Sequence, residues 1–223
     1  MAAKAEVKGD ACAWFEALYA EAGGDAGLIP WADGEPNPNF MSWPSADALA
    51  QGTLSLVVGC GLGDDAQELA RRGLSVTAFD LSPSAIEACR RIYPDSSVRY
   101  EAQDLFRLPD AYHQQFEFVL EIYTLQAMPL SIRAGAFAAL ARCLAPGGRL
   151  LVIARLRDDD VIPDQLPWPL SRAELRAFEE AGLQLECLED YMDDEDVPQR
   201  RVRACYRRPS DGSLAQAGGS SPD

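Results

Sequence analysis

A glycine-rich run holds the clearest chemical signal in the sequence. Gly59, Gly61 and Gly63 lie in VVGCGLGDD, between a short apolar stretch and a segment with helical periodicity. Glycine lets the backbone come close to a ligand because it has no Cβ. The start of the following helix offers free backbone N–H groups and the positive end of the helix dipole. These features predict a nucleotide-like ligand where the first strand ends.

The residues around the last glycine argue against a phosphate at this loop. The spacing G-x-G-x-G departs from the dinucleotide fingerprint G-x-G-x-x-G, and Asp64 and Asp65 follow at once. Two carboxylates at a helix N-terminus would repel a pyrophosphate and compete for the same N–H groups. The Lys-Ser/Thr pair of a P-loop is also missing. We therefore expect the loop to face a part of the ligand that is not anionic.

Two more aspartates follow later apolar stretches. Asp80, in TAFDLS, is placed to accept hydrogen bonds from both hydroxyls of a ribose. Asp104, in AQDLF, is placed to accept one from the amino group of adenine, since an ionised carboxylate only accepts. Each signal is weak alone, because an aspartate at a strand end more often caps a turn or a helix. Together with the glycine loop, they describe an adenosine site without phosphates.

An alternating pattern of strands and helices is expected to position these residues. Apolar runs predict strands at residues 54–59, 75–79, 98–102, 116–123 and 149–154. Helical periodicity and end signals predict helices at residues 10–22, 64–72, 83–92, 131–144 and 171–181. Repeated strand–helix units predict an α/β fold, a Rossmann-like three-layer αβα sandwich around a mostly parallel sheet.

The two ends of the chain depart from this alternation. Strands at residues 183–191 and 201–207 are joined by a short acidic segment, which favours an antiparallel C-terminal hairpin. We expect residues 10–50 to form an N-terminal helix and then a segment rich in proline and aromatic residues, without helix or strand because of its prolines. This segment is either a lid or substrate wall, or an aromatic plug over the core. We expect a single domain over residues 1–208 and a disordered tail over 209–223.

Composition excludes several classes of protein. The 223 residues are 48% apolar and 25% charged, the balance of a globular protein rather than of a disordered chain. A net charge of −15 argues against nucleic acid and anionic membranes as partners. No apolar run is long enough to span a bilayer. The six cysteines are scattered and His113 is the single histidine, so we expect no metal site, reduced thiols and a cytoplasmic location.

The sequence resembles the class I S-adenosylmethionine-dependent methyltransferases. The resemblance covers roughly residues 14–208 and rests on VVGCGLGDD, FDLSPSAI, FEFVLEIYTLQAMP and LAPGGRLLVI. It implies S-adenosylmethionine as cofactor, S-adenosylhomocysteine as product, and a seven-stranded sheet whose last strand is antiparallel. A looser likeness to thiopurine and small-thiol methyltransferases rests on the N-terminal aromatic segment, LARRGLSVTAFDLSPSAI, and VIARLRDDD followed by LPWPLSRAEL.

The resemblance also implies which residues bind the cofactor. They are Gly59, Cys60, Gly61, Gly63, Asp80, Leu81, Asp104, Leu105 and Glu121. The glycines would flank the methionine part, Asp80 would hold the ribose, and Leu81 would pack on the adenine. Asp104 and the Leu105 backbone would face the adenine edge. Glu121 would lie under the sulfonium end. It stands where relatives often have Asp or Asn, so its role would be to bind the cofactor's amino group, to line the substrate pocket, or to cap a turn.

The acceptor is expected at the carboxyl ends of the fourth and fifth strands. Its candidate binding residues are Trp31, Tyr123, Arg155 and Trp168, and the candidates for a catalytic role are Tyr123, Glu121 and Arg155. Arg155 would fix an anion, or pair with the acidic run 158–160. Trp31 and Trp168 would sandwich a flat or apolar acceptor, press on the cofactor sulfur, or pack in the core or lid. His113 lies in a polar loop, where an exposed position competes with a role as general base.

Three functions fit these residues. The first is methyl transfer to a small-molecule thiol, a soft nucleophile that ionises easily and needs little help from a base. The second is methylation of nitrogen or oxygen in a small metabolite or natural product. The third is a protein that binds S-adenosylmethionine without catalysis. The expected partner is a small molecule, with neither nucleic acid nor membrane, for a monomer or homodimer.

Overall fold

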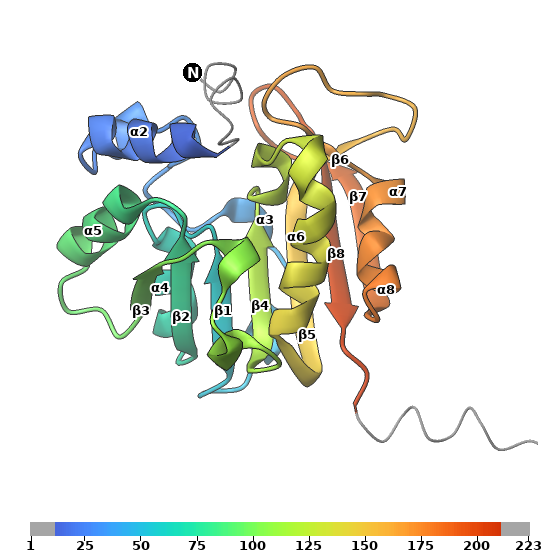
Figure 1. Cartoon of the computed structure of the whole chain (residues 1–223), viewed down its shortest axis with the longest axis horizontal. Coiled ribbons are helices and arrows are strands. Elements are labelled where there is room, and N and C mark those ends of the chain that lie inside the picture. Colours follow the sequence, from blue (N-terminus) through green and yellow to red (C-terminus); the bar gives the residue numbers. More distant parts are fainter. Residues whose placement is uncertain (1–11, 211–223) are drawn as a thin grey trace, which may run out of the picture.

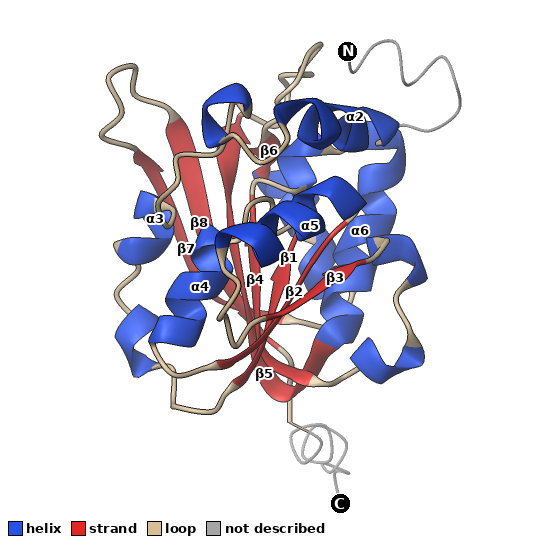
Figure 2. Ribbon diagram, turned by 90° about the vertical axis from the view of Figure 1, so that its left-hand side faces the viewer, coloured by secondary structure: helices blue, strands red, loops and turns tan. Residues whose placement is uncertain are grey.

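The computed structural model describes residues 12–210, and its strands form one sheet between layers of helices (Figures 1 and 2). The strand order is β3-β2-β1-β4-β5-β8-β7. The strands are β1 (Leu54–Val58), β2 (Ser75–Asp80), β3 (Arg99–Ala102), β4 (Phe116–Ile122), β5 (Leu144–Arg157), β6 (Leu170–Ser171), β7 (Gln184–Met192) and β8 (Arg200–Arg207). β1 to β5 pair in parallel, while β8 is antiparallel to both β5 and β7. The predicted sandwich and C-terminal hairpin are confirmed.

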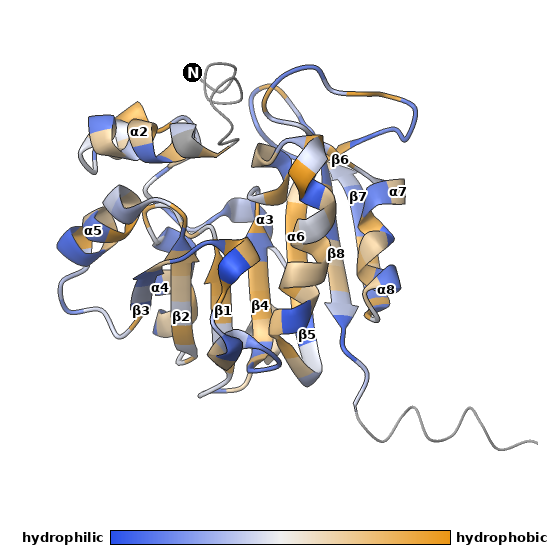
Figure 3. Ribbon diagram, viewed as in Figure 1, coloured by the Kyte–Doolittle hydropathy of each residue, from blue (hydrophilic) through white to orange (hydrophobic). Residues whose placement is uncertain are grey.

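The helices lie on both faces of this sheet. They are α2 (Ala13–Ala22), α3 (Pro38–Met41), α4 (Asp64–Arg71), α5 (Pro83–Ile92), α6 (Leu130–Cys143), α7 (Arg172–Leu175) and α8 (Ala177–Glu180). Along β4, Val119 packs in the core on the α6 side, whereas Phe118 and Leu120 pack in the core on the α4 side. Burial on both faces explains why the central strands read as continuous apolar runs, orange in Figure 3. A leucine buried as fully as Leu120 stabilises the fold by about 1.5–3 kcal/mol.

Local signals fix α5 at the predicted residues. The Ser82 hydroxyl accepts a hydrogen bond from the Ala85 N–H at 3.0 Å, and Pro83 takes the first helical position. Gly73, with φ of 90°, follows the end of α4 as expected. Both helices therefore begin or end at residues whose conformational preferences the sequence reveals.

Four local predictions need correction. The expected helix at 171–181 is broken at Arg176 into α7 and α8, and the two-residue strand β6 that precedes it was not predicted. β5 begins at Leu144 rather than 149, because the turn around Gly147 is a register shift within the strand pair. The proline-rich segment contains α3, since Pro38 suits a first helical position and Asn37 caps the helix.

Part of the predicted C-terminal tail, 211–223, and the first eleven residues lie outside the described residues. Within residues 12–210, no helix is both long enough and apolar enough to cross a membrane.

Candidate cofactor and acceptor site

A cavity of about 1570 Å³ lies at the carboxyl ends of the central strands. Gly59 follows β1, Leu81 follows β2, Thr124 follows β4 and Arg155 belongs to β5, and all four line the cavity. α2 lies above this edge of the sheet and contributes a wall (Figure 1). The parallel topology therefore brings together residues that are almost a hundred positions apart in sequence.

The glycine loop is shaped by its protein neighbours. Gly59, Gly61 and Gly63 have left-handed φ values of 62°, 54° and 94°, which favour glycine. A Cβ on Gly59 would collide with the Thr124 side chain, and one on Gly61 would lie 2.9 Å from the Tyr19 hydroxyl. We predicted that the missing Cβ atoms make room for a ligand, but at Gly59 and Gly61 protein side chains use that room. Among the three glycines, Gly59 lines the main cavity.

Asp80 is buried in the cavity wall with an exposed fraction of 7%. One carboxylate oxygen accepts a hydrogen bond from the Gly61 N–H at 3.0 Å, and the other accepts one from the Ser82 N–H at 2.9 Å. Burial raises the pKa of Asp80, and the two backbone hydrogen bonds counteract part of that rise. Each oxygen keeps a further lone pair, so the carboxylate has the acceptors that a pair of ribose hydroxyls needs. Leu81 beside it is 42% exposed.

Asp104 and Leu105 line the same cavity. The Asp104 carboxylate accepts a hydrogen bond from the Phe106 N–H at 2.9 Å, which is the turn-capping role that competes with ligand binding. Its other oxygen lies 3.7 Å from the exposed guanidinium of Arg107. Phe106 is 41% exposed, so an apolar surface adjoins this carboxylate.

The two acids after the glycine loop are held by other parts of the chain. Asp65 accepts a hydrogen bond from the Asn37 N–H at 2.7 Å, and burial raises its pKa to about 6. Asp64 accepts one from the Tyr93 hydroxyl at 2.6 Å. Both carboxylates occupy the first turn of α4, and Cys60 lines a small pocket beside them. The start of α4 therefore carries negative charge where a dinucleotide enzyme would hold its pyrophosphate.

Glu121 does not line the cavity. Its side chain is fully buried, and one carboxylate oxygen accepts a hydrogen bond from the Leu125 N–H at 2.9 Å. Among the described residues the other oxygen has no hydrogen-bond partner. Burial raises the pKa of Glu121 to about 7. Of the roles considered for it, the geometry matches the cap of a turn, and that turn carries Thr124 and Gln126 in the cavity wall.

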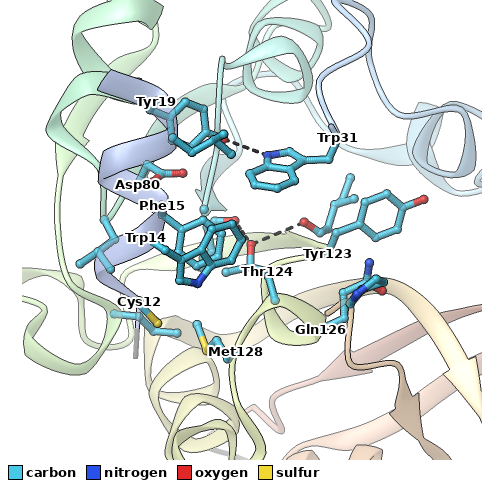
Figure 4. A pocket seen from close by; sticks show the side chains of 18 of the residues that line it. Cys12, Trp14, Phe15, Tyr19, Trp31, Asp80, Tyr123, Thr124, Gln126 and Met128 are labelled. Carbon is cyan, nitrogen blue, oxygen red and sulfur yellow. Dashed lines mark hydrogen bonds between the residues drawn. The ribbon is translucent and has the colours of Figure 1, made fainter. Parts of the chain in front are cut away.

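Tyr123 offers its ring rather than its hydroxyl to the cavity. Its φ is 63°, and its hydroxyl accepts a hydrogen bond from the Asn39 side chain at 3.1 Å. Figure 4 shows this hydroxyl pointing away from Trp14 and Phe15. Burial raises the pKa of Tyr123, which disfavours the phenolate that a general base requires. His113, the other candidate base, has a side chain that is 42% exposed and does not line the cavity.

Arg155 lines the cavity, whereas Trp168 does not. The predicted alternative for Arg155, an ion pair with the acidic run 158–160, does not form. Asp158 bonds to Arg200 instead, and Asp159 bonds to the backbone of α7. The backbone N–H of Trp168 donates a hydrogen bond to the backbone carbonyl of Gln126 at 2.7 Å, and Gln126 itself lines the cavity. The two residues before Trp168, Leu166 and Pro167, line the cavity instead.

An aromatic group on α2 covers the cavity, and sequence reasoning missed most of it. Trp14 stacks on Phe15 with ring centroids 3.9 Å apart and meets Trp31 edge-on at 5.7 Å (Figure 4). The Trp31 indole N–H donates to the Tyr19 hydroxyl at 3.0 Å. The helical periodicity of residues 10–22 predicted the helix, but only its packing against α5 shows that it covers this site. Trp31 was predicted, and it lines the cavity.

Comparison with known proteins identifies the kind of domain. The model of a methyltransferase domain family matches residues 56–148. A 2-heptyl-1-hydroxyquinolin-4(1H)-one methyltransferase of Mycobacteroides abscessus is 26% identical over 155 residues, 66% of this chain and 65% of that protein. A ubiquinone biosynthesis O-methyltransferase of Xanthomonas oryzae pv. oryzae is 33% identical over 118 residues, 52% of this chain and 48% of that protein. The chain thus spans less than two thirds of either relative.

A solved structure extends the comparison to the whole fold. The 1,6-didemethyltoxoflavin-N1-methyltransferase of Burkholderia thailandensis, with bound 1,6-didemethyltoxoflavin and S-adenosylhomocysteine, superposes with a TM-score of 0.69. The sequence identity is 18%, and 89% of each chain is covered. The predicted resemblance is confirmed at the level of the domain and the fold: residues 56–148 match a methyltransferase domain family, and the chain has the class I methyltransferase fold.

Proposed function

We propose that the protein transfers a methyl group from S-adenosylmethionine to a small-molecule acceptor. The observation that carries this proposal is the buried Asp80 carboxylate, which is held by the glycine loop and faces the cavity, while Asp64 and Asp65 put negative charge at the start of α4. A ligand with a ribose and no phosphate fits these charges. The methyltransferase domain match over residues 56–148 supports the same ligand.

The cavity has room for two molecules. The adenosine part of the cofactor is assigned to the side of Gly59, Asp80 and Asp104, with Leu81 against the adenine. The acceptor is assigned to the side of Tyr123 and to the β5 wall. Figure 4 shows Asp80 and Gln126 on opposite sides of the cavity with Thr124 between them, as such a division requires.

The protein's contribution to the reaction is alignment and exclusion of water. S-adenosylmethionine supplies the methyl group on a positively charged sulfur. The acceptor must meet that group in line, and a preorganised site lowers the barrier by holding both molecules in place. Trp14 and Phe15 on α2, together with Trp31 from the segment after it, line the cavity with apolar surface that helps to exclude water.

The acceptor atom is proposed to be oxygen or nitrogen. The relatives named above include a methyltransferase of ubiquinone biosynthesis that methylates oxygen and a toxoflavin-pathway enzyme that methylates nitrogen. The Mycobacteroides abscessus relative is named for a hydroxyquinolinone acceptor. The thiol acceptor that was predicted from the sequence stays a prediction. Thiols are therefore included among the acceptors to be tested.

We further propose a cytoplasmic monomer or homodimer that binds no nucleic acid. The six cysteines form no disulfide in the part of the chain that the structure describes, which suits a reducing compartment. The net charge of −15 would repel a phosphate backbone.

The test is a screen for S-adenosylhomocysteine release with hydroxyquinolines, hydroquinones, nitrogen heterocycles and thiols as acceptors. We expect release with flat aromatic oxygen or nitrogen acceptors, and less release with the Asp80→Asn variant at the same subsaturating cofactor concentration. Binding of S-adenosylmethionine without release from any acceptor would favour a non-catalytic binding protein. Failure to bind S-adenosylmethionine would contradict the proposal itself.

A further inference from the structure

Arg155 is an unpaired cation in the cavity wall. Among the arginines of residues 12–210, only Arg142, Arg155 and Arg176 have side chains that form no hydrogen bond or ion pair. Arg142 and Arg176 are exposed to solvent, whereas Arg155 is half-buried and lines the cavity. The chain carries 35 acidic residues against 20 basic ones, yet no described carboxylate pairs with Arg155. A desolvated guanidinium is costly unless an anion balances it.

A second arginine stands directly opposite. Arg155 on β5 and Arg201 on β8 are paired in the antiparallel ladder, and both line the cavity. Like charges opposite each other on one face of a sheet are destabilising. Arg201 is neutralised, because its guanidinium bonds to Asp193 at 2.5 Å and to Glu195, and it lies over the Tyr123 ring. Arg155 receives no such compensation from the described residues.

Gln126 adds a neutral donor to the same cavity wall. Its side-chain oxygen accepts a hydrogen bond from the backbone N–H of Arg155 at 2.6 Å, which fixes the orientation of the amide. Its side-chain nitrogen has no hydrogen bond to the described residues, and the residue lines the cavity. A guanidinium and an amide N–H₂ group are the donors that a pair of oxygens on one anion requires.

The rest of the wall indicates what carries the anion. Trp31 is 37% exposed, and Phe15 and Met128 line the same cavity. Exposed aromatic and apolar surface in a cavity favours a flat, apolar ligand body.

From these contacts we infer that the methyl acceptor is a flat aromatic molecule with an oxyanion, a carboxylate or an ionised hydroxyl, bound by Arg155 and Gln126. This inference rests on the proposed function and specifies its substrate class. An acceptor that binds as an ionised hydroxyl has already released its proton to water. Tyr123 and His113 are poorly placed as bases, and such an acceptor needs neither of them.

The test compares anionic and neutral probes on protein saturated with S-adenosylhomocysteine. 2-Naphthoate and 2-naphthamide share one shape and differ in charge, and 7-hydroxycoumarin absorbs differently as phenol and as phenolate. We expect wild type to bind 2-naphthoate about tenfold more tightly than 2-naphthamide, or to lower the pKa of bound 7-hydroxycoumarin by about one unit. The first result identifies a carboxylate and the second an ionised hydroxyl. Either supports the inference.

Variants locate the effect. Arg155→Gln is expected to abolish the preference, Arg155→Lys to keep part of it, and Arg142→Gln, an exposed and equally unpaired arginine, to leave it unchanged. No preference in wild type, no binding of any probe, or the same preference in Arg155→Gln would overturn the inference. S-adenosylhomocysteine binding is measured in the same samples. If wild type binds S-adenosylhomocysteine but shows no preference for the anionic probe, this inference alone is overturned. If wild type does not bind S-adenosylhomocysteine, the proposed function is overturned as well.

Discussion

Asp80 shows how one side chain links the loop to the ligand. Its two oxygens accept backbone N–H groups from Gly61 and Ser82, so the carboxylate is fixed before any ligand arrives. Such preorganisation reduces the ordering cost of binding. Because the same carboxylate is buried, ribose hydroxyls would find it with few competing waters.

Replacing Asp80 tests the ribose assignment. Asp80→Asn removes the charge and turns one acceptor into a donor, so S-adenosylhomocysteine should bind more weakly by about 1–3 kcal/mol. Isothermal titration calorimetry measures the change, and Asp95→Asn, an exposed aspartate after α5, is the matched control. Equal affinity of Asp80→Asn and wild type would refute the assignment.

Glu121 should make stability depend on pH. Burial raises its pKa from 4.5 to about 7, so the folded protein holds this proton more tightly than the unfolded chain. The resulting stabilisation is complete below pH 4.5 and is lost as the pH rises to about 7. Between pH 5.5 and 8, the free energy of unfolding of wild type should fall by about 2 kcal/mol relative to Glu121→Gln. Urea denaturation at both pH values measures this.

The control for that experiment is Glu87→Gln, on the exposed face of α5. It should follow the wild-type pH dependence. If Glu121→Gln also ran parallel to wild type, Glu121 would not titrate in this range, and its burial next to the Leu125 N–H would need another explanation.

At the scale of elements, the Glu16 carboxylate helps to hold α2 over the cavity. Glu16 accepts hydrogen bonds from the hydroxyls of Ser82 at 2.5 Å and Ser84 at 2.7 Å, at the start of α5. Burial alone would raise the pKa of Glu16, but these hydrogen bonds outweigh it and lower the pKa. The ionised form therefore holds α2 against α5.

Removing this carboxylate should loosen the helix without unfolding the sheet. Hydrogen bonds to a charged group contribute about 1.5–3 kcal/mol, so amide exchange in α2 should accelerate about 10- to 100-fold in Glu16→Ala. Hydrogen–deuterium exchange measures this, and Glu21→Ala, exposed on the same helix, is the control. Unchanged exchange in Glu16→Ala would show that aromatic packing alone holds α2.

Elements with local signals were predictable, and those set by distant partners were not. α5 follows from Ser82 and Pro83, which are adjacent in sequence. The start of α7 has a local signal too, the capping box between Ser171 and Glu174, although the Glu174 carboxylate also bonds to Arg133 and Arg157 from other elements. β6, in contrast, exists because Leu170 and Ser171 pair with the end of β5. That pairing is not written in the local sequence.

The candidate site divides in the same way. Gly59, Asp80 and Asp104 lie at strand ends that apolar runs reveal, so they could be placed from the sequence. Trp14 and Gln126 reach the cavity only because α2 packs on α5 and the turn after β4 packs under β5. Trp168 was predicted to line the cavity but does not, because tertiary packing decides which side chains of a loop point inward.

At the scale of the whole molecule, charge and topology select the same kind of ligand. The sheet places its strand ends around one large cavity, and the first helix after the glycine loop begins with two carboxylates. An open parallel sheet of this kind would also suit a dinucleotide. The acids at α4 separate the two possibilities, because a pyrophosphate there would meet like charge.

The most direct measurement is a calorimetric titration of the wild-type protein with S-adenosylmethionine and, separately, with NAD. The carboxylates at the start of α4 and the ribose acceptor Asp80 predict micromolar binding of the sulfonium nucleoside and no measurable heat with NAD. Binding of NAD, with no binding of S-adenosylmethionine, would contradict the account.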